Sequence, residues 1–101
     1  MKEIEFITNN QTDFLIYLKS KFPVIHNSNF FFRDFHYGVM SFLKEHNMKS
    51  TYRFAETVAV EIGLAFEKQE VFKRIDGQTW LINYPDFALP RPEKKVAEKS
   101  A

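Results

Sequence analysis

The clearest alternation of apolar and polar positions lies in residues 31–46. Plotted at about 100° per residue, the apolar side chains fall on one face of a helix and the polar ones on the other. The largely apolar face consists of Phe32, Phe35, Val39, Phe42, Leu43 and His46. Tyr37 falls on the opposite face beside Arg33 and Ser41, which makes it a candidate contact for a partner.

A second helix is predicted over residues 51–68, capped by Ser50 or Thr51. Its apolar stripe consists of Phe54, Ala55, Val58, Ile62, Ala65 and Phe66. Val60 and Leu64 lie outside this stripe, among charged residues. They form a small apolar patch that predicts a contact with a partner protein or with the tail of this chain. The alternative is that Phe87 or Leu89 of the same chain covers them.

The break at residues 47–50 is short, and Asn47 suits a left-handed helix end. Such a break can hold two helices at a steep angle, as in a helix–turn–helix.

A β-hairpin is predicted over residues 71–84. Asp76-Gly77 stands between two strand-like runs and suits a two-residue turn in which both positions have positive φ. This turn pairs Val71 with Ile82, Lys73 with Trp80 and Ile75 with Gln78.

The N-terminal third is less regular. Residues 1–8 predict a short strand or an ordered arm, and the sequence from Thr8 to Gln11 suits a capping box at the start of a helix. This helix ends at about Phe22, because Pro23 follows. Residues 24–32 are compatible with a turn, a short strand, or a strand leading into the next helix.

These elements predict an α+β fold that is mostly helical, with three helices and a C-terminal hairpin. The chain has 101 residues, which favours one domain. We assign residues 1–87 to it and residues 88–101, which are rich in proline and charge, to a flexible tail.

Composition narrows the classes of function. The chain has no cysteine, which excludes disulfides, thiolate nucleophiles and Cys-ligated metals. No stretch approaches the roughly 20 apolar residues that span a bilayer, and the N-terminus is not a secretory signal. We therefore expect a cytoplasmic protein. Twelve phenylalanines suit a small core, although Phe30 is assigned to a partner contact.

Catalytic and metal motifs are missing from the sequence. His36 and His46 lie about 80° apart on a helix and nearly three turns from each other, and no zinc-type spacing includes His26. The three glycines are too scattered to form a phosphate loop. We expect neither an enzyme nor a cofactor.

The motif FLKEHNMKSTYRFAETVAVEIGLAFEKQ followed by FKRIDGQTWLI resembles the winged-helix superfamily over residues 31–84. The resemblance implies a helix–turn–helix with the hairpin as the wing. Winged-helix proteins include transcription factors and protein-docking modules, so the resemblance leaves the function open.

Two functions follow as hypotheses. The first is a non-catalytic docking module, an adaptor or accessory subunit, that binds a protein through Val60, Leu64, Phe30 and Tyr37; a homodimer is compatible with it. The second is a DNA-binding regulator that uses the helix at 51–68 and the wing at 71–84. Its contacts would be Lys49, Ser50, Tyr52, Arg53, Thr57, Lys73 and Arg74. The net charge of +1 and the acidic residues on the helix favour the protein partner.

Overall fold

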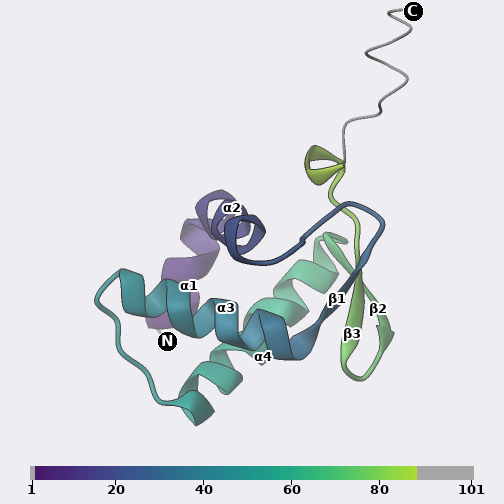
Figure 1. The fold of residues 1–101 in the computed structure, drawn as a ribbon. Coiled ribbons are helices and arrows are strands. Elements are labelled where there is room, and N and C mark those ends of the chain that lie inside the picture. The colour runs from purple at the N-terminus through teal and green to yellow at the C-terminus, as the bar shows by residue number, and fades with distance from the viewer. Residues whose placement is uncertain (1, 89–101) are drawn as a thin grey trace, which may run out of the picture.

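The computed structural model describes residues 2–88, in which helices pack against a small antiparallel sheet (Figure 1). The helices are α1 (Lys2–Asn9), α2 (Gln11–Lys21), α3 (Phe32–Glu45) and α4 (Tyr52–Lys68), with a short 3₁₀ helix η1 (Pro85–Phe87). The strands are β1 (Asn29–Phe31), β2 (Phe72–Asp76) and β3 (Thr79–Ile82). The prediction of a mostly helical α+β domain is confirmed. The predicted tail lies outside the described residues, apart from Ala88.

The N-terminal segment forms two helices, where the sequence predicted a strand or an arm followed by one helix. The capping box at Thr8 is wrong, because the Thr8 hydroxyl donates back to the carbonyl of Ile4 at 3.0 Å inside α1. Asn10 separates the helices with a φ of −123° and a ψ of 39°. Its side-chain amide donates to the carbonyl of Phe6 at 2.8 Å. The described residues therefore contain four α-helices instead of three.

The strand β1 is the short strand that the sequence allowed before the next helix, and it pairs antiparallel with β3. This pairing sets Phe30 opposite Trp80 and turns its side chain into the core, where it is 2% exposed. The ring of Phe30 lies 6.0 Å from that of Phe72. The prediction of Phe30 as a partner contact is wrong. Its neighbour Phe31, on the other side of the strand, is 51% exposed.

The hairpin β2–β3 is present, but its register differs by one residue from the prediction. The observed pairs are Phe72 with Ile82, Lys73 with Leu81 and Arg74 with Trp80, with an irregularity between Arg74 and Asp76. The three strands have the spatial order β1-β3-β2.

The shift in register has two causes. Asp76 pairs with Thr79, which moves the turn by one residue and would alone move the partner of Lys73 by two positions; the irregularity between Arg74 and Asp76 reduces this to one. The carboxylate of Asp76 accepts a hydrogen bond from the N–H of Gln78 at 2.8 Å, so Asp76 closes the turn instead of forming its first central position. Gly77 does not have the positive φ that the predicted turn type requires. The predicted pairing of Lys73 with Trp80 is therefore wrong, and Arg74 lies over the indole ring, 5.7 Å from its centroid.

The connection between α3 and α4 follows the prediction closely. Asn47 has a φ of 62°, the left-handed conformation expected at a helix end. The Thr51 hydroxyl accepts from the N–H of Phe54 at 3.0 Å and caps α4. The chain thus passes from α3 to α4 through a short connection, and α4 runs toward the sheet (Figure 1).

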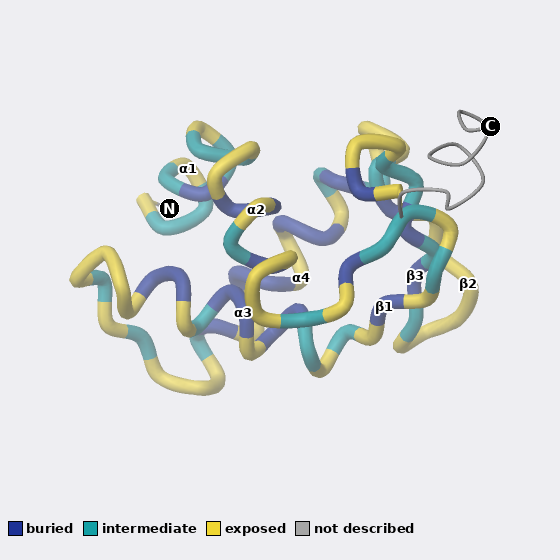
Figure 2. The backbone as a smooth tube through the Cα atoms, turned by 45° about the horizontal axis from the view of Figure 1, so that its top comes forward, coloured by how far each residue is buried: buried dark blue, intermediate teal, exposed yellow. Residues whose placement is uncertain are grey.

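The core is aromatic and centres on Phe35. Its ring meets those of Trp80, Phe72 and Phe14 edge-on at 5.1, 5.4 and 5.8 Å, an arrangement that aromatic rings favour. Buried positions recur along α3, α4 and β3, whereas most of β2 is exposed (Figure 2). One side of α4 is therefore fixed by the core, and the other faces solvent.

Candidate functional site

The exposed side of α4 carries an apolar patch in its middle. Val60 and Leu64 lie one turn apart, and each is 44% exposed. Phe87, which the sequence offered as a cover, is buried elsewhere: the N–H of His26 donates to its carbonyl, and the ammonium of Lys19 lies over its ring. Within the described part of the chain, the Val60–Leu64 patch remains a solvent-facing surface.

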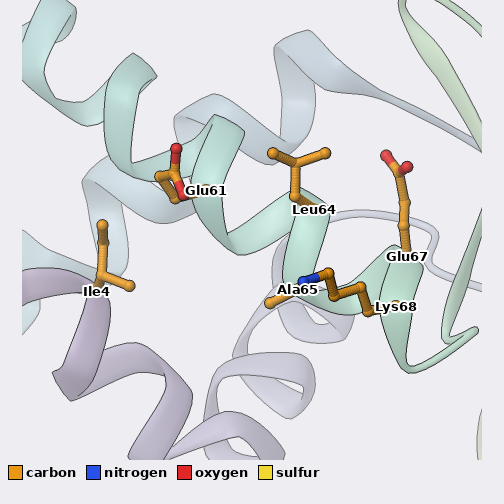
Figure 3. A pocket seen from close by; sticks show the side chains of 6 residues that line it. All are labelled: Ile4, Glu61, Leu64, Ala65, Glu67 and Lys68. Carbon is orange, nitrogen blue, oxygen red and sulfur yellow. The ribbon is translucent and has the colours of Figure 1, made fainter.

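An open hollow of about 540 Å³ lies on the side of the patch toward α1. It is lined by Ile4 of α1 and by Glu61, Leu64, Ala65, Glu67 and Lys68 of α4. Figure 3 shows the aliphatic side chain of Leu64 between Glu61 and Lys68 along α4, with Ile4 on the neighbouring helix. Leu64 is thus accessible from the hollow.

A second open hollow, of about 260 Å³, lies on the other side of the patch, between α4 and the hairpin. Its lining consists of Phe32, Glu56, Val60, Arg74, Gly77, Gln78 and Trp80. The patch therefore forms a ridge with a hollow on each side. A ridge of this form can contact side chains of a partner on both flanks.

The hairpin is tied to α4 by Glu67. Its Oε2 atom accepts a hydrogen bond from Nε1 of Trp80 at 2.8 Å and another from the guanidinium of Arg74, with which it forms a salt bridge. Burial raises the pKa of Glu67. The hydrogen bonds from Arg74 and Trp80, together with the charge of Arg74, outweigh this effect and hold its pKa below the ordinary value.

The tip of the hairpin has a second stabilised carboxylate. The backbone N–H of Gln78 and the side chain of Thr79 donate to Asp76, and these bonds lower its pKa. Asp76 is fully exposed, and its carboxylate stabilises the turn by accepting the hydrogen bond from Gln78.

The residues assigned to DNA contacts lie in the connection before α4, at the start of α4 and on β2. Lys49, Tyr52, Arg53 and Thr57 are exposed near the start of α4, and Lys73 is exposed on β2. Arg74, however, is engaged by Glu67. Ser50 has a buried hydroxyl with no hydrogen-bond partner in the described part of the chain. It lies beside a hollow of about 370 Å³ whose other lining residues are Met40, Lys44 and Lys49.

Tyr37 and Tyr52 lie side by side, although the sequence assigned them to different partners. Their ring centroids are 6.1 Å apart, and both side chains are about half exposed. The buried His36 holds the pair together, since its ring lies 4.2 Å from that of Tyr52 and its Nε2 donates to the Tyr52 carbonyl at 2.9 Å. This aromatic pair is distinct from the Val60–Leu64 patch.

Two of these features have no direct signal in the amino-acid sequence. The Tyr37–Tyr52 pair depends on how α3 crosses α4. The Glu67–Arg74 bridge depends on the reversal of the chain at Glu70, which has a φ of 63°. Glutamate is not among the residues enriched at positive φ, so the sequence carries no local signal for this reversal.

Residues 2–88 contain no group of three or more His, Asp or Glu side chains arranged to hold a metal ion. In the same part of the chain, no helix has the length and apolar character needed to cross a bilayer.

Comparisons of the chain with protein-family models, with curated proteins and with solved structures found no match. The proposed function therefore rests on the geometry.

Proposed function

We propose that this chain is a non-catalytic docking module of the winged-helix type, an adaptor or accessory subunit that binds a protein through the exposed side of α4. The observation that carries the proposal is the Val60–Leu64 patch, which is exposed in the middle of α4 and flanked by a hollow on each side. Exposed apolar surface at the centre of a polar rim is typical of protein interfaces.

The order of elements supports the winged-helix part of the proposal. A helix–turn–helix of α3 and α4 is followed by the hairpin β2–β3, and β1 completes the sheet on the free side of β3. In this arrangement α4 has the position of the recognition helix in a helix–turn–helix protein.

Charge favours a protein over a nucleic acid as the partner. On the exposed side of α4, the basic residues Arg53 and Lys68 are balanced by the acidic residues Glu56 and Glu61. Arg74 neutralises Glu67. A helix with this balance releases few counterions from DNA, and its carboxylates would face the phosphates.

A substitution of Leu64 by Glu tests the proposal. Leu64→Glu leaves the core intact, because the side chain is exposed, and we expect it to weaken binding of the partner by about tenfold or more. Proteins retained from a native extract are quantified for the parent and the variant. Ile16→Glu on α2 is the matched control, since Ile16 is 56% exposed. If Leu64→Glu retains every protein that the parent retains, the docking proposal is wrong.

DNA binding is the second candidate, favoured by the exposed Lys49, Tyr52 and Arg53 at the start of α4. Titration of duplex DNA at several salt concentrations tests it. If the chain is a protein-docking module, it should bind duplex DNA weakly, and Arg53→Glu and Lys73→Glu should leave this binding unchanged. A strong salt dependence that these substitutions abolish would favour the regulator.

A further inference from the structure

The hollow beside α1 carries charges that can pair with those of an identical hollow on a second molecule. Glu61 lies three residues before Leu64 and Lys68 lies four residues after it, so each is about one turn, or roughly 5 Å along the axis, from Leu64. All three side chains line the same hollow (Figure 3). An acid and a base therefore flank one exposed leucine at almost equal distances.

Neither of these charges is satisfied within the described residues. The salt bridge found in residues 2–88 joins Arg74 to Glu67, and neither Glu61 nor Lys68 takes part in it. Both side chains are exposed. Each can therefore pair with a group of opposite charge on another molecule.

We infer that this surface binds a second copy of the chain across a two-fold axis, with the two α4 helices antiparallel. Leu64 of each copy lies against Leu64 of the other and enters the hollow beside Ile4 and Ala65. Glu61 of each copy faces Lys68 of the other. This inference rests on the proposed function, because it names the partner that docks on the same side of α4.

Antiparallel pairing follows from the spacing of the charges. A two-fold axis that passes near Leu64, perpendicular to α4, makes the two α4 helices antiparallel. It brings Glu61 of one copy to the level of Lys68 of the other, and both side chains remain on the side of the helix pair that faces α1. Both contacts are then attractive. Parallel pairing would bring Glu61 to the level of Glu61 and Lys68 to the level of Lys68, so it would form neither attractive contact.

The proposed interface between the two copies is small, so we expect the affinity of the dimer to be low. Stable interfaces bury about 1,200–2,000 Å² in total, and one face of α4 with the edge of α1 falls at or below the lower end of this range. We therefore expect a reversible dimer with a Kd on the order of 10–100 µM.

Charge reversal tests the pairing by analytical ultracentrifugation of the full chain over a range of concentrations. Glu61→Lys or Lys68→Glu alone makes both symmetric contacts repulsive, so the Kd should rise about tenfold. The double variant Glu61→Lys/Lys68→Glu should return it to within about threefold of the parent. An equimolar mixture of the two single variants should also associate, because unlike copies then attract at both contacts.

The controls carry the same charge changes on α3. Glu45→Lys and Arg33→Glu, both at exposed positions, should leave self-association unchanged. A parent that stays monomeric at all concentrations overturns the inference, and so do single variants that associate as tightly as the parent. If the parent is monomeric while Leu64→Glu still loses a different protein, the docking proposal stands and only the second copy is excluded.

Discussion

At Gly63, α4 passes directly over the indole ring of Trp80. A Cβ atom at this position would lie 2.8 Å from Cζ2 and 3.2 Å from Cη2 of the ring. Trp80 is 2% exposed and surrounded by other aromatic side chains, so it cannot move aside freely. The glycine therefore sets the distance between α4 and the sheet.

We predict that Gly63→Ala lowers the free energy of unfolding by about 1–3 kcal/mol, although alanine favours helix formation, because the overpacking outweighs the propensity. Gly77→Ala is the control. Its Cβ meets no atom within 4 Å and its φ is not positive, so the change should stay within about 0.5 kcal/mol. Urea unfolding measures both, and equal stability of Gly63→Ala and the parent would contradict this packing.

Glu67 gives the protein a defined dependence on pH. Its pKa is lower in the folded chain than in the unfolded chain, so its contribution to stability is present above the unfolded pKa and is lost as the pH falls through the folded pKa. We predict that Glu67→Gln reduces the free energy of unfolding at pH 7, and that the difference from the parent shrinks as the pH falls below about 4.5.

The control for this titration is Glu45→Gln, an exposed carboxylate for which no hydrogen bond occurs within residues 2–88. At pH 7 its free energy of unfolding should stay within about 0.5 kcal/mol of that of the parent. A Glu67→Gln variant whose difference from the parent is constant between pH 7 and pH 3 would mean that the bonds to Arg74 and Trp80 do not stabilise the carboxylate.

At the scale of the element, the start of α4 offers two adjacent hydroxyls with opposite roles. The Thr51 hydroxyl caps the helix, while that of Ser50 is buried without a partner in the described residues. We predict that Thr51→Ala destabilises the fold by about 1 kcal/mol. Ser50→Ala should be neutral or stabilising, because it removes an unsatisfied polar group. Thermal unfolding of the two variants distinguishes them, and an equal loss in both would show that neither hydroxyl acts as the geometry indicates.

The elements that the sequence predicted well are those with strong local signals. Neighbouring residues decide the cap of α4, which was predicted at Ser50 or Thr51 and lies at Thr51. They also decide the left-handed Asn47 and the apolar stripes of α3 and α4. The hairpin was located correctly but its register was not. The register depends on the irregularity between Arg74 and Asp76 and on a turn in which Gln78 donates to the side chain of Asp76, in place of the turn that the Asp-Gly pair favours.

At the scale of the whole molecule, the predictions that were wrong concern contacts between segments far apart in sequence. Phe30 is buried because β1 pairs with β3, some 50 residues away, and no local pattern specifies this pairing. The helix α1 forms where a strand or an arm was expected, and it packs its Ile7 into the core. The Val60–Leu64 patch could be predicted because helical periodicity alone places these two residues outside the buried stripe of α4.

Both edges of the sheet are poor templates for a further strand. The strand β1 has three residues, and β2 is interrupted between Arg74 and Asp76, next to the exposed Lys73. Short, irregular and charged edges resist pairing with strands of other chains. Addition of further strands is therefore disfavoured at both edges of the sheet, and contacts of this molecule with others are more readily made through its helices.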